Sequence, residues 1–251
     1  MASSSSSHGA TRASKLRRLD DIRRACPHMS ASAMSAMLQE CTDDLPILTG
    51  RGHISEASTA VLESNDAYGD MLSKLPAISS EGEGTTVTVV NLFSILQAAF
   101  EQGGSYQELL LRTVHEHEGR PLNMVLYFDE IVPGDPVGYA NKRKFWTCYA
   151  AFKEFGPEVL CNEACWIPLL ELRTEQCSLL AAGISQVCKL ILRDIFLSDR
   201  CDVKNSGLLL KSESGYLRLF IEFGFLVQDG AAHKMVFHTK RELRDQDVSH
   251  L

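Results

Sequence analysis

The chain has 251 residues, a formal net charge of −7 and a hydrophobic fraction of 45%. This length allows one core with an accessory segment, or two small domains. The acidic balance argues against a protein that binds nucleic acid over its whole surface, although a local basic patch can still do so. No stretch approaches the roughly 20 uninterrupted apolar residues of a membrane helix. The eight cysteines include no Cys-x-x-Cys pattern, so we expect a soluble intracellular protein with no membrane partner.

The N-terminal part predicts a polar arm followed by a basic segment. Residues 1–14 are rich in Ser and bury too little apolar surface to order the chain, so we expect disorder there. The basic segment that follows is open to three interpretations: an organelle transit peptide, a nuclear-entry or phosphate-contacting patch, and a solvated helix face. We favour a nuclear over an organellar location. The arginines that would contact nucleic acid are Arg17, Arg18, Arg23 and Arg24.

Residues 15–84 are predicted to form a mostly helical accessory region that ends in a linker. Residues 85–102 then favour a buried strand that turns into a helix, or one continuous helix. Residues 105–118 favour a further helix, because Ser105 and Glu108 have the spacing of a capping box. The His-Glu-His triplet at 115–117 is a poor zinc site, since adjacent helical side chains point about 100° apart.

Strand patterns dominate the rest of the predicted α/β core, which spans residues 85–240. The run 122–129 is apolar at both alternating sets of positions, which is typical of a central strand covered on both faces. Apolar residues recur at three and four over 174–197 and alternate over 216–227, which predicts one helix and one strand. Further strands are predicted at 142–155, where the spacing also fits a helix, at 165–172, where Pro168 favours a sheet edge, and at 207–210.

Two of the predicted strands end in a carboxylate, Asp129 and Asp229. Mg²⁺ takes oxygen ligands, and acids held side by side can bind one or two such ions for hydrolysis or phosphoryl transfer. Asp129 and Asp229 are therefore candidate catalytic and metal-binding residues. The alternative is that each aspartate simply starts a turn through its own side-chain hydrogen bonds. Glu130 is either an outer partner of the pair or a solvated strand end.

Four segments between about residues 120 and 240 carry a resemblance to a known family: L-N-M-V-L-Y-F-D-E-I-V-P-G-D-P, N-K-R-K-F-W-T-C-Y-A-A-F-K-E-F-G-P, C-W-I-P-L-L-E-L-R-T and F-G-F-L-V-Q-D-G-A-A-H-K. They resemble largely uncharacterised, transposon-type open reading frames that are multiplied in protist genomes, dinoflagellates especially. These frames look like relatives of the RNase H-like, DDE-type transposases. The resemblance implies an RNase H-like mixed sheet flanked by helices, in which the first and fourth strands end side by side in acids.

The same resemblance implies chemistry on DNA. Asp129 and Asp229 would bind Mg²⁺ and support attack of water or a DNA 3′-hydroxyl on a phosphodiester, with His233 and Lys234 near the phosphate path. The family's third acid comes from a later helix. Here only Glu242, Asp245 and Asp247 follow, within the charged tail 241–251, so the core is expected to be incomplete. The competing hypotheses are a catalytically inactive, transposon-derived protein that binds DNA or another partner, and a truncated gene product.

Overall fold

The structure is a computed structural model that describes residues 12–25, 34–35, 56, 59–60, 62, 65–132, 144–213 and 215–237. The chain divides into two compact units, Met1–Ser64 and Asn65–Leu251. In the first unit, helix α1 spans Arg12–Ala25, so it begins inside the stretch expected to be a disordered arm. The rest of that arm and the charged tail lie outside the described residues.

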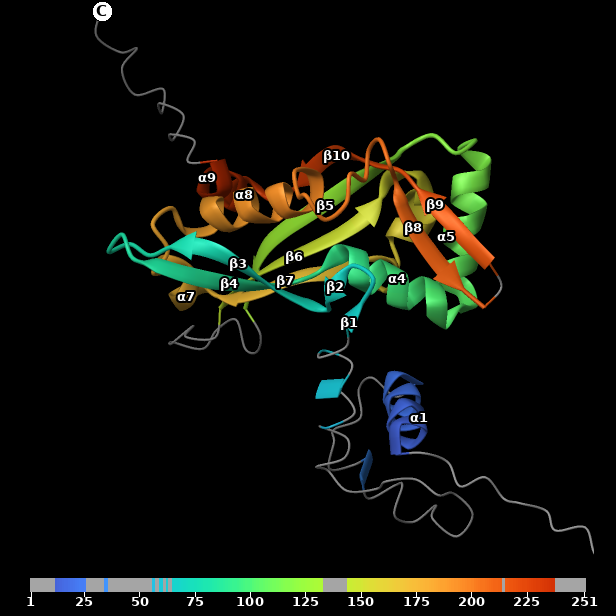
Figure 1. Ribbon diagram of the computed structural model, residues 1–251. Coiled ribbons are helices and arrows are strands. Elements are labelled where there is room, and N and C mark those ends of the chain that lie inside the picture. The colour runs from blue at the N-terminus through green and yellow to red at the C-terminus, as the bar shows by residue number, and fades with distance from the viewer. Residues whose placement is uncertain are drawn as a thin grey trace, which may run out of the picture. The chain divides into compact units, whose positions relative to one another are not determined.

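The second unit is a mixed α/β structure built on a four-stranded sheet of order β10-β5-β6-β7 (Figure 1). Strands β5, β6 and β7 are antiparallel neighbours, and β10 runs parallel to β5 on its other side. The α/β class is therefore confirmed. The four strands are β5 (Leu122–Ile131), β6 (Phe145–Phe152), β7 (Ile167–Arg173) and β10 (Ile221–Val227).

Helices and three small hairpins surround this sheet. The main helices are α4 (Leu92–Gln102), α5 (Gly104–Glu116), α8 (Gly183–Phe196) and α9 (Gly230–Phe237), with the short helices η1 (Lys153–Phe155), α6 (Pro157–Leu160), η2 (Glu163–Cys165) and α7 (Thr174–Ser178). The hairpins pair β1 (Asn65–Asp66) with β2 (Gly69–Asp70), β3 (Leu72–Ile78) with β4 (Gly84–Val90), and β8 (Leu208–Ser212) with β9 (Gly215–Leu219).

One face of the sheet forms the core. Every second residue of β5 from Leu122 to Phe128 has no exposed surface, and the facing positions of β6 are equally buried. The buried stripe of α8 joins this core through Ile184, Val187, Cys188, Ile191 and Ile195. The opposite face of β5 is covered less, because Val125 is buried whereas Tyr127 and Asp129 remain partly exposed. The expectation of a strand covered on both faces is thus met fully on the core face and, on the other face, at Val125.

The hairpin β3–β4 lies in a segment expected to be part of a linker. Its side chains Leu75, Ala77, Val87 and Val89 belong to the same core as the main sheet. The structure therefore divides the chain near residue 65 instead of residue 85. The glycines at 69, 82 and 84 end and connect short strands there, so the punctuation that resembled a linker belongs to tight hairpins.

Two predicted elements are each divided in the structure. The helix expected over 174–197 is broken into α7 and α8, because residues 179–181 bond to the β3 end: Ser80 N–H donates to the Leu179 carbonyl and Ala181 N–H to the Ile78 carbonyl. The helix α5 begins after Gly103 instead of being capped by Ser105.

The strand expected over 216–227 is divided at Phe220 into β9 and β10, which belong to different sheets. Within β10 a bulge at Gly224 shifts the register, from Phe223 opposite Met124 to Phe225 opposite Val125. A Cβ atom at Gly224 would lie 2.9 Å from the Met124 carbonyl oxygen, so the bulge requires glycine. The apolar residues of β10 therefore do not share one face, contrary to the prediction from their alternation.

Candidate functional site

The register of the two parallel strands brings Asp129 and Asp229 to the same edge of the sheet. Val227 is the last residue of β10 that pairs with β5, and its partner is Tyr127. Asp229 lies two residues after Val227, and Asp129 lies two residues after Tyr127. Side chains two residues apart on a strand share a face, so both aspartates follow the face of Tyr127 and Val227. The register therefore leads the two aspartates to neighbouring strand ends, and their role as a metal-binding pair stays a prediction.

Tyr127 connects this site to the sheet. Its hydroxyl donates a hydrogen bond of 2.8 Å to Asp129 Oδ2, and its ring packs edge to face on Trp166. The pKa of Tyr127 is raised to about 12, first by this hydrogen bond, then by burial and by the negative charges of Asp129 and Asp229. Since both carboxylates act on one phenol, they lie within electrostatic range of the same point. The sequence analysis did not predict a role for Tyr127 at this site. Its position two residues before Asp129 on the same strand would have indicated that the two side chains share a face.

The backbone around Asp129 is fixed by the neighbouring strand. Thr147 lies directly opposite Asp129 on β6, and its hydroxyl donates a hydrogen bond of 3.3 Å to the Asp129 carbonyl oxygen. Thr147 is only 2% exposed. A buried hydroxyl with a backbone partner holds the strand end in place, which limits the positions that the Asp129 carboxylate can take.

Asp229 has a second role as a helix cap. Its Oδ1 accepts a hydrogen bond of 2.6 Å from Ala232 N–H, in the first turn of α9. This is the usual geometry of an N-cap aspartate, whose negative charge also faces the positive end of the helix dipole. Asp229 therefore also fits the alternative interpretation, in which a strand-terminal aspartate begins the next element.

Glu130 belongs to a different cluster. Adjacent strand residues point to opposite faces, and the Glu130 carboxylate accepts hydrogen bonds from Lys144 Nζ at 3.2 Å and from the Thr174 hydroxyl at 2.8 Å. These contacts tie the ends of β5 and β6 to the start of α7. Glu130 is thus neither a solvated strand end nor an outer partner of Asp129.

The expected nucleic-acid contacts lie in two helices. Arg17 is exposed on α1, and Arg23 on the same helix is partly exposed. Arg18 and Arg24 also belong to α1, but their side chains lie outside the described residues, as do the side chains of His233 and Lys234 in α9. The two helices belong to separate units. The candidate third acids Glu242, Asp245 and Asp247 lie outside the described residues.

Within the described ranges, no group of three or more His, Cys, Asp or Glu residues is arranged to hold a metal ion. Among the described residues, the carboxylates at this sheet edge are those of Asp129 and Asp229. Mg²⁺ is commonly bound by one or two protein carboxylates, with water and substrate phosphate oxygens completing its octahedron. Such a pair fits one weakly held Mg²⁺ ion better than a fully enclosed cation.

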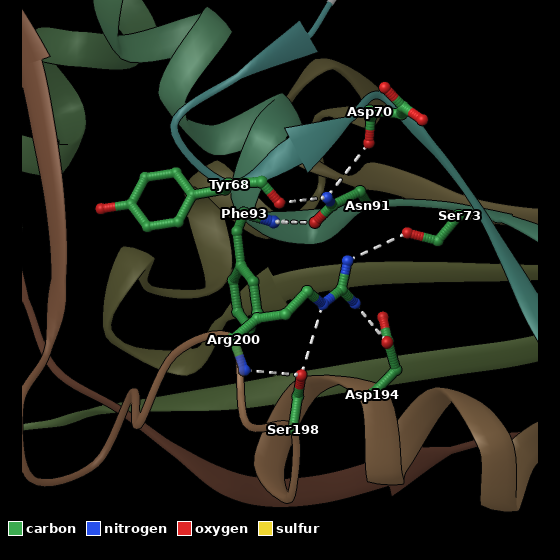
Figure 2. Close-up of polar contacts among 8 residues, drawn as sticks. All are labelled: Tyr68, Asp70, Ser73, Asn91, Phe93, Asp194, Ser198 and Arg200. Atoms are coloured by element: carbon green, nitrogen blue, oxygen red, sulfur yellow. Dashed lines mark hydrogen bonds and ion pairs between the residues drawn. The ribbon is translucent and has the colours of Figure 1, made fainter.

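A second polar cluster surrounds Arg200 beside the hairpin β3–β4 (Figure 2). The Arg200 guanidinium donates hydrogen bonds to the Asp194 carboxylate, to the Ser198 hydroxyl and to the Ser73 hydroxyl, and it lies 5.9 Å from the centre of the Phe93 ring. A cavity of about 450 Å³ opens beside this cluster, and its lining also includes Asp70 and Lys74. The cluster was not predicted, because its members come from three separate segments of the sequence.

To the right of Phe93 in the same view, Asn91 connects strands to α4 (Figure 2). Its side-chain amide donates hydrogen bonds to the carbonyls of Tyr68 and Asp70, while its carbonyl oxygen accepts one from Phe93 N–H. Asn91 has no exposed surface and caps α4. These bonds give both the donor and the acceptor group of a buried polar side chain a partner, and they hold the hairpin β1–β2 to the start of α4.

Among the helices of the described residues, none has the length and apolar character needed to cross a membrane. No family model, no curated protein and no solved structure matches this chain.

Proposed function

We propose that this chain is a transposon-derived, RNase H-like protein that binds Mg²⁺ through Asp129 and Asp229 and cleaves or transfers phosphodiester bonds in DNA. The observation that carries the proposal is the register of β10 against β5, which brings the two aspartates to neighbouring strand ends. A divalent cation at this position would neutralise two like charges and stabilise the negative charge that develops on a phosphate.

The order of the strands supports the same proposal. An RNase H-like core has an antiparallel run of three strands, followed by a helix and a fourth strand parallel to the first. Here β5, β6 and β7 form the antiparallel run, α8 follows, and β10 lies parallel to β5. The hairpin β8–β9 is inserted between α8 and β10, which accounts for the long stretch of chain before the second aspartate.

The chain's own groups would act mainly by positioning. Tyr127 donates to Oδ2 of Asp129, and the first turn of α9 donates to Oδ1 of Asp229. A cation would therefore be bound by the other two oxygens, Oδ1 of Asp129 and Oδ2 of Asp229. His233 and Lys234, in the helix that Asp229 caps, would be near the DNA phosphates.

The test is a nicking assay on supercoiled DNA with and without Mg²⁺, together with Mg²⁺ titration of the melting temperature. We expect Mg²⁺-dependent nicking by the full chain and its loss in Asp129→Asn and Asp229→Asn. Glu130→Gln is the matched control, because it neutralises the adjacent acid on the opposite face. At a free Mg²⁺ concentration of about 100 times the Kd, Mg²⁺ binding should raise the free energy of unfolding by about 2.7 kcal/mol. Equal nicking by the full chain and by Asp129→Asn would contradict the proposal.

A second candidate function is a catalytically inactive, transposon-derived protein that binds DNA. The helix cap at Asp229 favours it, because this bond gives the aspartate a structural reason to be present. This function predicts salt-sensitive DNA binding without nicking. Replacing Arg17 and Arg23 with Ala should then reduce the slope of log K against log salt by up to about two units.

A further inference from the structure

The strand β10 is an edge strand of the main sheet, and β5 is its neighbour among the described strands. The beginning of its outer edge is covered, since Ile221 N–H donates to the Val203 carbonyl at 2.9 Å and Glu222 faces Lys204. The remaining residues, Phe223 to Val227, continue past this loop. An edge strand presents a row of backbone donors and acceptors that another strand can pair with.

The side chains on this part of β10 are unusually apolar for an edge. Phe223, Phe225 and Val227 are 46%, 43% and 38% exposed. Glu222 is the one charged residue of the strand, and it lies at the covered end. Proteins commonly protect free edges with charges, proline or a covering element. An edge that lacks such protection over Phe223 to Val227 indicates a surface for pairing.

The opposite edge of the same sheet shows the contrast. Strand β7 carries Pro168, which cannot donate a backbone hydrogen bond, and the exposed charges Glu171 and Arg173. Strand β4 also contacts β7. One edge of the sheet is therefore protected in three ways, whereas the exposed half of the other is not.

The composition of the chain's own C-terminal segment does not fit this apolar edge. Residues 238–251 have no alternating apolar pattern, and they include the charged residues Lys240, Arg241, Glu242, Arg244, Asp245 and Asp247. A strand that pairs with β10 needs apolar side chains beside Phe225 and Val227 on one face. The sequence of β10 itself supplies such side chains.

We propose that β10 pairs antiparallel with β10 of a second copy of this chain, around a two-fold axis at Leu226. In this register Phe225 lies opposite Val227 of the second copy, and both belong to the face that carries Tyr127. Leu226 lies opposite its own equivalent, and Gly224 lies opposite Gln228. Glu222 has no like charge opposite it. The two four-stranded sheets then become one continuous sheet with an isologous interface.

The interface is short, so the association is weak. A strand pair of this length buries less than the standard interface of about 1,600 Å². We therefore expect a reversible dimer with a Kd in the range from about 1 μM to 1 mM. This inference depends on the free edge of the sheet and not on metal binding, so it stands or fails separately from the proposed function.

Sedimentation velocity of the full chain over a concentration series tests the dimer. We expect a concentration-dependent shift to the dimer for the unmodified chain. The double variant Phe225→Lys and Val227→Lys places like charges opposite each other in the proposed register and should raise the Kd at least tenfold. Tyr216→Lys is the control, because Tyr216 is a more exposed apolar residue that lies on β9 and outside the proposed interface, and this change should leave the Kd unchanged.

A charge-exchange experiment tests the register and also shows that the variants are folded. The variant with Glu at both 225 and 227 should not form dimers alone. Mixed with the double-Lys variant, it should form a heterodimer at a Kd within about tenfold of the original, because each Lys then faces a Glu. A chain that stays monomeric up to about 1 mM, or a dimer unaffected by the double-Lys change, overturns the proposal.

Discussion

The two polar clusters of the second unit differ in how their charges are balanced. Around Arg200, the cation has a carboxylate partner in Asp194 and two hydroxyl partners (Figure 2). At the ends of β5 and β10, two carboxylates act on the same phenol of Tyr127. A balanced cluster holds elements together, whereas an unbalanced one attracts a cation. The Arg200 cluster is therefore a structural contact, whereas the two aspartates form a candidate cation site.

The largest expected effect is the loss of stability when the balanced cluster is broken. Arg200→Ala removes the partner of a partly buried Asp194, and we expect the free energy of unfolding to fall by about 2 kcal/mol. Arg200→Lys keeps the charge but cannot reproduce the several directed bonds, so it should recover part of this loss. Urea denaturation measures both values. Unchanged stability in Arg200→Ala would mean that the cluster does not hold the hairpin β3–β4 to α8.

A smaller effect is expected at the helix cap. Asp229→Ala removes the acceptor for Ala232 N–H and should cost about 1 kcal/mol. Asp229→Asn retains a good capping side chain, so its stability should remain close to that of the original chain. The Mg²⁺-induced rise in melting temperature should nevertheless be lost in both variants. Retention of that rise in Asp229→Asn would exclude Asp229 as a metal ligand.

Replacing an aspartate with asparagine should change the free energy of unfolding in opposite directions in the two clusters. Without divalent cations, Asp129→Asn relieves repulsion from Asp229 while its amide oxygen still accepts from Tyr127, so we expect stabilisation of up to about 0.5 kcal/mol. Asp194→Asn should instead destabilise, since it weakens the bond from Arg200. Denaturation curves of the two variants measure both changes in the free energy of unfolding. Changes in the same direction would contradict the distinction between a balanced and an unbalanced cluster.

The smallest effect is a change in a titration. The hydrogen bond to Asp129 is the largest cause of the raised pKa of Tyr127. Asp129→Asn replaces the charged acceptor of this bond with a neutral one and removes a nearby negative charge, so that pKa should fall from about 12 towards its ordinary value of 10.0. Because the pKa is higher in the folded state, the stability contributed by this phenol is present below pH 10 and is lost as the pH rises from 10 to about 12. Absorbance titration of the phenolate, with Tyr127→Phe identifying the signal, measures the shift.

Much of the central sheet could be predicted from the sequence, because its strands are apolar and well separated. The run 122–129 became β5, and Pro168 marked β7 as an edge strand, as predicted. The positions of Asp129 and Asp229 after two apolar runs were also predictable, whereas their action as a pair stays a prediction. These successes depend on local patterns that tertiary contacts did not override.

The errors arise where tertiary contacts decide the local structure. Alternation over 216–227 gave no sign of the division at Phe220, which depends on bonds from Ile221 to Val203 and from Leu122 to Phe220. The helix over 174–197 is interrupted by bonds to the end of β3. Similarly, the Arg200 cluster joins residues from three separate segments. No pattern within one segment could have indicated these long-range contacts.

The bulge at Gly224 sets the strand register that leads to Asp229. Before the bulge, Ile221 pairs with Leu122 and Phe223 with Met124. If that pairing continued unchanged, Asp229 would fall beside Glu130, on the face where Lys144 and Thr174 already bind a carboxylate. The single extra residue changes the phase of the strand by one position. A residue with no side chain, five positions away from the site, thus decides whether the two aspartates share a face.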